Sequence, residues 1–143
     1  MSNVRPAPIY DPIADEESRA SRSWILFFNG IFEGDTGTSW TPTFVNLTQT
    51  GTPTITGYYY RITRRLVYFR VDITPATNTS ATAGSTYIDN FPLVFSGNGI
   101  CFAVTGNLGD GPGMVAAATN RIYVPTWTTV TVPLSVIGIC EAG

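Results

Sequence analysis

The stretch Thr54-Ile-Thr-Gly-Tyr-Tyr-Tyr-Arg-Ile-Thr-Arg-Arg-Leu-Val-Tyr-Phe-Arg-Val-Asp-Ile-Thr74 decides the fold class. From Val67 to Ile73 the apolar residues stand at every second position, which is the spacing of a strand with one buried face. The charged residues of 60–65 interrupt this pattern, so we predict a hairpin there between two long strands, 54–63 and 66–74.

The same β signal extends over the rest of the chain, because Thr, Val, Ile and Tyr dominate after residue 34 and Gly and Pro interrupt them at short intervals. Pro133 within the last apolar run indicates an edge or a bulge. We therefore expect a mainly β chain, with an antiparallel β-sandwich or jelly-roll-like domain over 35–143. The other predicted strands are 41–47, 86–90, 100–105, 121–124 and 128–139.

The Gly-rich segment 103–118 superficially resembles a dinucleotide-binding loop. The glycine spacing is wrong for that motif, Pro112 lies within the segment, and no parallel βαβ unit surrounds it. We expect a long surface loop here and no cofactor.

The N-terminal third is different in character. Residues 1–20 contain three prolines and four acidic residues, so we expect them to form an extended arm. The arm either docks on a partner through Ile9, Tyr10, Asp11 and Pro12 or is disordered when the chain is alone. Segment 21–34 predicts one short helix, since large apolar residues recur there at helical spacing. The many large apolar side chains of this short helix must be buried, either across the core of its own domain or against copies of the same helix in other chains. We favour self-association. The interface residues would be Trp24, Phe27, Phe28, Ile31 and Phe32.

Composition excludes several kinds of activity. The 143 residues contain no His, and all eight basic residues are Arg, with a net charge of −2. Without imidazole we expect no Ser-His-Asp catalysis and no ordinary zinc site. So few cations disfavour binding to nucleic acid. No apolar run is long enough for a membrane span, and the first residues lack the apolar core of a secretory signal.

Two groups of side chains are candidate sites. Asp72 and Asp89 lie in or beside predicted strands and could act as acid and base, but pairing with Arg is the simpler interpretation, with Arg70 as the partner of Asp72. Arg61, Arg64, Arg65 and Arg70 lie among tyrosines around the hairpin. This cluster can bind nucleic acid or an anionic sugar, or its arginines simply face water or the acids of a neighbouring subunit. The candidate surface-ligand contacts are Tyr58, Tyr60, Arg61, Arg64 and Arg65. We predict no catalytic, cofactor-binding or metal-binding residue.

Cys101 and Cys140 both stand in apolar strand contexts, too far apart in sequence to suggest a metal site. We expect buried, reduced thiols, while a disulfide would require the two strands to be adjacent.

Several runs resemble a family of tailed-bacteriophage virion proteins, the tail-fibre-like or appendage-like modules. The first run is Trp24-Ile-Leu-Phe-Phe-Asn-Gly-Ile-Phe-Glu-Gly-Asp-Thr-Gly-Thr-Ser-Trp-Thr-Pro-Thr-Phe44, and Gly51-Thr-Pro-Thr-Ile-Thr-Gly-Tyr-Tyr-Tyr-Arg-Ile62 follows. Further similar runs are Asn78 to Leu93, Asn120 to Trp127 and the end from Gly138. The resemblance covers most of the chain after about Ser21, and it brings no catalytic residues with it.

The resemblance implies a non-enzymatic structural protein that is made in the bacterial cytoplasm and assembled into the virion. The expected form is a homotrimeric fibre-like appendage, a tail fibre or tip, whose arm docks on a tail, adaptor or capsid protein and whose outer domain contacts host-surface glycan. A trimeric capsid decoration protein, cement protein or head fibre is the first alternative. A glycan-binding or polysaccharide-cleaving module is the second.

Overall fold

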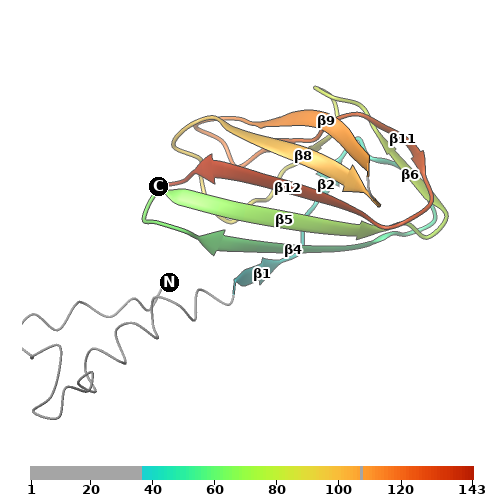
Figure 1. Ribbon diagram of the computed structural model, residues 1–143, viewed down its shortest axis with the longest axis horizontal. Coiled ribbons are helices and arrows are strands. Elements are labelled where there is room, and N and C mark those ends of the chain that lie inside the picture. The colour runs from blue at the N-terminus through green and yellow to red at the C-terminus, as the bar shows by residue number, and fades with distance from the viewer. Residues whose placement is uncertain (1–36, 107) are drawn as a thin grey trace, which may run out of the picture. The chain divides into compact units, whose positions relative to one another are not determined.

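The computed structural model describes residues 37–106 and 108–143, and these form an antiparallel, mainly β fold (Figure 1). The predicted arm and helix, with all their anchoring and interface residues, lie outside the described residues. Residues 37–143 form one compact unit. The described part contains twelve strands and no helix. They are β1 (Thr38–Trp40), β2 (Phe44–Val45), β3 (Thr48–Thr50), β4 (Thr54–Arg61), β5 (Leu66–Thr74), β6 (Asn78–Ala81), β7 (Tyr87–Ile88), β8 (Gly99–Thr105), β9 (Leu108–Val115), β10 (Ile122–Tyr123), β11 (Trp127–Val130) and β12 (Leu134–Glu141).

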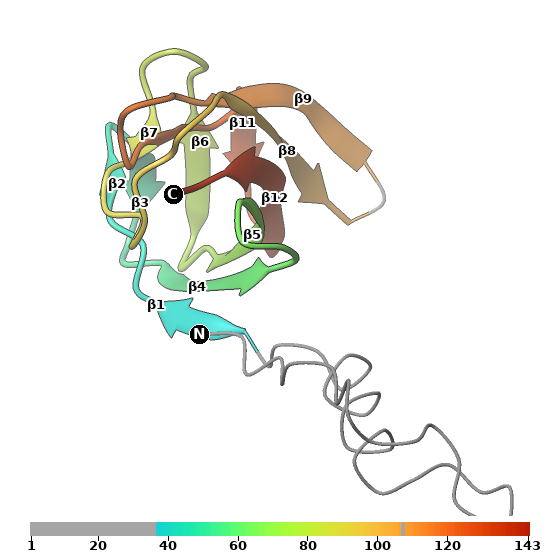
Figure 2. The ribbon, with the colours of Figure 1, turned by 90° about the vertical axis from the view of Figure 1, so that its left-hand side faces the viewer.

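Nine of the strands form one sheet in the order β1-β4-β5-β12-β8-β9-β10-β7-β2. The two edge strands, β1 and β2, are consecutive in the chain and are separated only by residues 41–43, so the sheet must curl round until its edges approach each other (Figure 2). Asn90 fastens this junction, because its side-chain amide donates to the carbonyl oxygen of Thr41 and accepts from the amide of Thr43.

A second, three-stranded sheet has the order β11-β6-β3. It joins the same core through Trp127 of β11 and Ala81 of β6, both of which are buried. Trp127 donates from its indole Nε1 to the hydroxyl of the buried Thr79, at 3.3 Å. This bond satisfies two polar groups that would otherwise be buried without partners.

Strand β5 lies between β4 and β12, and its inner side chains show why these three strands are stable. Val67, Phe69, Val71 and Ile73 are fully buried, while the residues between them face outward. Residues 67–74 of this strand pair with β4, and residues 66–73 pair with β12 on its other side. The alternation read from the sequence is confirmed, and so is the hairpin: β4 ends at Arg61, β5 begins at Leu66, and the amide of Ile62 bonds the carbonyl of Leu66 at 2.9 Å.

The Gly-rich segment 103–118 differs most from the structure that its sequence predicts. The expectation of a long surface loop is wrong, because β9 runs through the segment and pairs with β8 on one side and β10 on the other. Gly113 explains how: a Cβ there would stand 2.4 Å from the carbonyl oxygen of Tyr123 and 2.6 Å from the sulfur of Cys101. At position 113 the strand has glycine because the neighbouring strands leave no room for a side chain.

Other strand boundaries also differ from the predictions. The single strand expected over 128–139 is two strands, β11 and β12, with Pro133 in the connection between them because proline cannot donate to a ladder. The strand expected over 41–47 shrinks to β2, and Asn46 after it has a positive φ of 58°. The short strands β1, β3 and β6 were not predicted.

Candidate functional site

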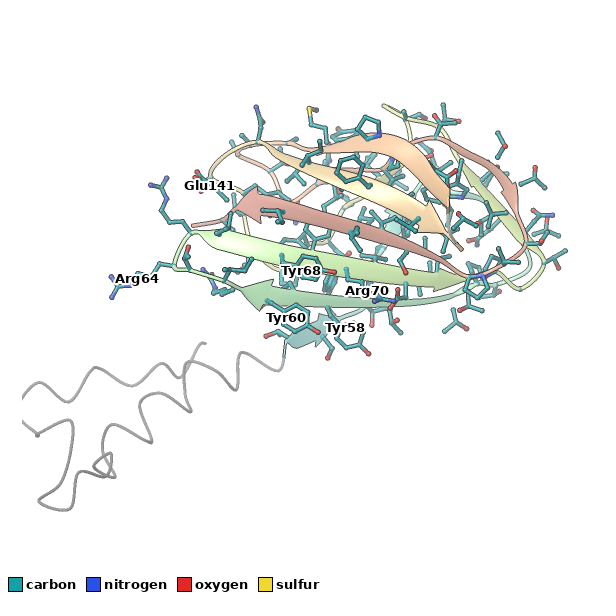
Figure 3. All side chains as sticks on the ribbon, viewed as in Figure 1. Tyr58, Tyr60, Arg64, Tyr68, Arg70 and Glu141 are labelled. Atoms are coloured by element: carbon teal, nitrogen blue, oxygen red, sulfur yellow. The ribbon has the colours of Figure 1, made fainter. Side chains whose placement is uncertain are left out.

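The outward side chains of β4 and β5 form a surface of tyrosines around one arginine (Figure 3). Tyr58 lies directly across from Arg70, and Tyr60 lies across from Tyr68. The rings of Tyr60 and Tyr68 are in contact, with centroids 5.8 Å apart. We call Tyr58, Tyr60, Tyr68, Arg70 and Asp72 the tyrosine–arginine face.

The guanidinium of Arg70 is held in place by its own strand. Its Nε lies 2.8 and 3.0 Å from the two carboxylate oxygens of Asp72. Ser135 on the neighbouring β12 donates to Asp72, and its hydroxyl oxygen lies 3.4 Å from an Nη of Arg70. Hydrogen bonding to Asp72, and then the charge of that carboxylate, raises the pKa of Arg70. The group therefore stays charged and oriented, although half of its side chain is exposed.

A shallow hollow of about 480 Å³ opens beside this face, at the ends of β5, β8 and β12. Its polar wall is the Arg70, Asp72 and Ser135 network, and its apolar wall includes Val104 and Ile137. Aromatic rings, fixed hydrogen-bonding groups and an open concave surface together suit a ligand with both polar edges and apolar faces.

The structure separates the predicted contact residues into two groups. Tyr58 and Tyr60 belong to the tyrosine–arginine face, whereas Arg61, Arg64 and Arg65 lie at the hairpin end. There Arg61 donates to the carbonyl oxygen of Arg64 at 2.9 Å, and Arg65 lies 3.6 Å from Glu141 at the end of β12. The side chains of Arg61 and Arg65 are thus engaged in local contacts.

Three residues of the tyrosine–arginine face, Tyr68, Arg70 and Asp72, were not among the five candidate surface-ligand contacts. Tyr68 and Arg70 share the outer face of β5, two residues apart, and the β4 register places Tyr60 and Tyr58 opposite them. The alternation along 66–74 predicts that Tyr68, Arg70 and Asp72 share the outer face. The residues between them, Val67, Phe69, Val71 and Ile73, are buried on the inner face, and neighbouring side chains of a strand point to opposite faces.

The predicted pairing of Asp72 with Arg70 is confirmed by the 2.8 Å contact. Asp89 pairs separately with Arg121, at 2.7 Å from its Nε, and that guanidinium also lies over the ring of Tyr87 at 5.0 Å from the centroid. Hydrogen bonding to Asp89 is the main cause of the raised pKa of Arg121. Each acid is therefore neutralised by its own arginine, and this geometry does not join them as an acid–base pair.

Cys101 and Cys140 are buried and free, as the sequence predicts. Burial raises the pKa of each thiol to about 12. Both thiols are therefore protonated near neutral pH and poorly reactive.

Within residues 37–106 and 108–143, no three His, Cys, Asp or Glu side chains come together as metal ligands. The same residues include no helix with the length and apolar character needed to cross a membrane. No protein-family model, curated protein or solved structure matches this chain. The case for a function therefore rests on the chain's own residues and on the sequence resemblance.

Proposed function

We propose that this chain is a non-enzymatic structural protein of a bacteriophage virion, a fibre-like appendage whose β-domain contacts glycan on the host surface. The resemblance of the sequence after about Ser21 to tail-fibre-like modules supports the proposal. The antiparallel β fold of residues 37–143, poor in charge and rich in Thr, suits such a module.

The proposed assembly is a homotrimer of β-sandwich-type domains. In this arrangement 1–20 is the extended arm that docks on a virion protein through Ile9-Tyr10-Asp11-Pro12. The segment 21–34 is the helical stem, whose Trp24 and Phe28 face the sister chains.

The observation that carries the proposed glycan contact is the tyrosine–arginine face. The tyrosine rings offer apolar surfaces against which the C–H faces of a sugar can pack, while the phenol hydroxyls can hydrogen-bond at the edges. Arg70 and Asp72 are held together with their donors and acceptors already oriented, which lowers the ordering cost of binding. A sugar with hydroxyls and carboxylates is matched by this combination of groups.

The binding test uses the full chain and purified host-surface polysaccharide. Tyr60→Ala with Arg70→Ala removes one ring and the fixed cation, and we expect at least a tenfold loss of affinity by biolayer interferometry. Arg64→Ala with Ile62→Ala is the matched control at the hairpin end and should leave binding unchanged. Equal binding by both double variants would contradict the assignment to this face.

The same preparation tests the enzymatic alternative. We expect no shortening of the polysaccharide during prolonged incubation, measured by size-exclusion chromatography. Cleavage that disappears in Asp72→Ala or Asp89→Ala would replace the structural proposal with that of a depolymerase.

The arm is tested by deleting residues 1–17. The truncated chain should keep the β circular-dichroism spectrum and thermal transition of the full chain but fail to join particles during phage assembly. Normal incorporation would show that the arm is not the anchor. In intact particles, crosslinking at Tyr10 to a tail or adaptor protein supports the fibre, while crosslinking to the major capsid protein favours the decoration protein or head fibre.

A further inference from the structure

Strands β8, β9 and β12 have an outer face that is apolar as well as an inner one. Ile100, Phe102, Met114 and Ile139 are 48%, 44%, 51% and 45% exposed. Residues that alternate with them, such as Cys101, Ala103 and Cys140, are buried in the core. A sheet face in contact with water usually carries polar residues at these outward positions, so this face departs from the usual pattern.

The ladder register joins these side chains into one patch. Ile139 lies across from Ile100, and Ile100 lies across from Met114. In the next row, the half-buried Ile137 lies across from Phe102. We call Ile100, Phe102, Met114, Ile137 and Ile139 the outer apolar strip. It contrasts with Ile62 and Val94, exposed apolar residues that lie outside these three strands.

The strip continues without interruption into the tyrosine–arginine face. On β5, Tyr68 lies across from Ile139, and Arg70 lies across from Ile137. The curled sheet therefore presents an uncharged apolar centre on β9, β8 and β12, and a polar, aromatic margin on β5 and β4. An apolar centre with a polar rim is the anatomy of a protein–protein interface.

The size and charge of the strip indicate what covers it. Four adjoining apolar side chains, each about half exposed, form a contiguous patch on the order of a few hundred Å². This is the size of the largest apolar patches on monomers, about 300–600 Å², which are often functional, and it supplies part of the roughly 800 Å² that each partner contributes to a stable interface. Because the five residues carry no charge, they match a second neutral apolar surface, as in a permanent contact between identical chains.

We propose that the outer apolar strip is an interface between β-domains, covered by the same strip on a second copy of this chain. The inference rests on the proposed self-assembly, and it assigns part of the contact to β8, β9 and β12 in addition to the 21–34 segment. It also places the tyrosine–arginine face beside the subunit boundary, so that a glycan bound there would lie at the rim of the assembly.

The first test is a thiol crosslink in the full chain. Phe102→Cys places one exposed thiol in the centre of the strip, and Val94→Cys, at a position 62% exposed, is the control. The two native thiols are buried with their pKa raised to about 12, so they do not compete. Under mild oxidation we expect a covalent dimer of Phe102→Cys that exceeds the Val94→Cys dimer at least fivefold at equal concentration. Equal yields would overturn the inference.

The second test replaces Phe102, Met114 and Ile139 together by Thr, a residue suited to exposed strand positions. The control replaces Ile62, Val94 and Val132 by Thr. Circular dichroism verifies that both triple variants are folded, and sedimentation velocity gives their masses. We expect only the strip variant to dissociate at a concentration at which the wild-type chain is assembled. An unchanged assembly would overturn the strip interface while leaving the proposed trimer intact, whereas a monomeric wild-type chain would overturn both.

Discussion

Tyr58 on β4 lies directly opposite Arg70 on β5, and Asp72 holds that arginine with both of its carboxylate oxygens, at 2.8 and 3.0 Å from Nε. The aromatic surface and the cation are therefore parts of one rigid ladder. Asp72 therefore has two effects that can be measured separately: it orients Arg70 for binding, and it contributes to the free energy of unfolding.

Asp72→Asn should disturb the site more than the fold. The pair is half exposed, so losing its charge should lower the free energy of unfolding by only about 0.5 kcal/mol. Polysaccharide affinity should fall more than threefold, because Nε of Arg70 loses the charged carboxylate that accepts its bifurcated hydrogen bond. Urea unfolding and interferometry measure the two effects. If Asp72→Asn lowers the free energy of unfolding by over about 2 kcal/mol and still binds polysaccharide normally, then Asp72 serves the fold and does not orient Arg70 for binding.

Gly138 should tolerate no side chain. A Cβ at this position would lie 2.4 Å from the Phe69 ring and 2.6 Å from the carbonyl oxygen of Ile100. Gly138→Ala should therefore destabilise the fold by about 2–3 kcal/mol through overpacking. Gly109→Ala is the matched control, since nothing lies within 4 Å of its added carbon. Urea midpoints that agree within error for the two variants would contradict the close packing around Gly138.

The bond between Trp127 and Thr79 ties the smaller sheet into the core. Thr79→Val keeps the shape of the side chain but leaves the buried indole N–H without its acceptor, so we expect a loss of about 1–3 kcal/mol. Thr56→Val, at an exposed position on β4, should change stability by less than about 0.5 kcal/mol. Thermal unfolding followed by Trp fluorescence compares them, and similar losses in both would argue against the bond.

The buried thiols make stability depend on alkaline pH. Their pKa in the folded chain is about 12, against an ordinary value of 9.0, so between these values the unfolded chain releases protons that the folded chain retains. Their contribution is fully present below pH 9 and is lost as the pH rises toward 12. At pH 10 we expect a loss of about 1 kcal/mol per thiol.

The double variant Cys101→Ala with Cys140→Ala isolates this effect. Its stability should fall less steeply between pH 8.5 and 10.5 than that of the wild-type chain, in urea titrations at each pH. Parallel curves would mean that the thiols already ionise normally in the folded protein.

The central strands could be predicted because burial on one face leaves a period of two in the sequence. Val67 to Ile73 shows that period clearly, and these residues of β5 are paired on both sides. The pairing of Asp72 with Arg70 follows from the same geometry, since residues two apart share a face.

The missed elements depend on neighbours that the sequence does not display. Gly113 and Gly138 are glycines in strands because other strands crowd their Cβ positions, and from local sequence alone the glycines of β9 suggest a loop. Strand β6 buries Thr79 and Ala81, a small polar residue and a small apolar one that give little periodic signal. The separation of Tyr58, Tyr60, Tyr68 and Arg70 from the hairpin arginines required the register between β4 and β5, which only the folded ladder supplies.

Self-assembly of this chain underlies both the proposed appendage and the proposed strip interface. Light scattering on a size-exclusion column gives the mass of the full chain in solution and so tests self-assembly. We expect a trimer, three times the 15.4 kDa of one chain. A mass of 15.4 kDa that persists at high protein concentration would contradict it.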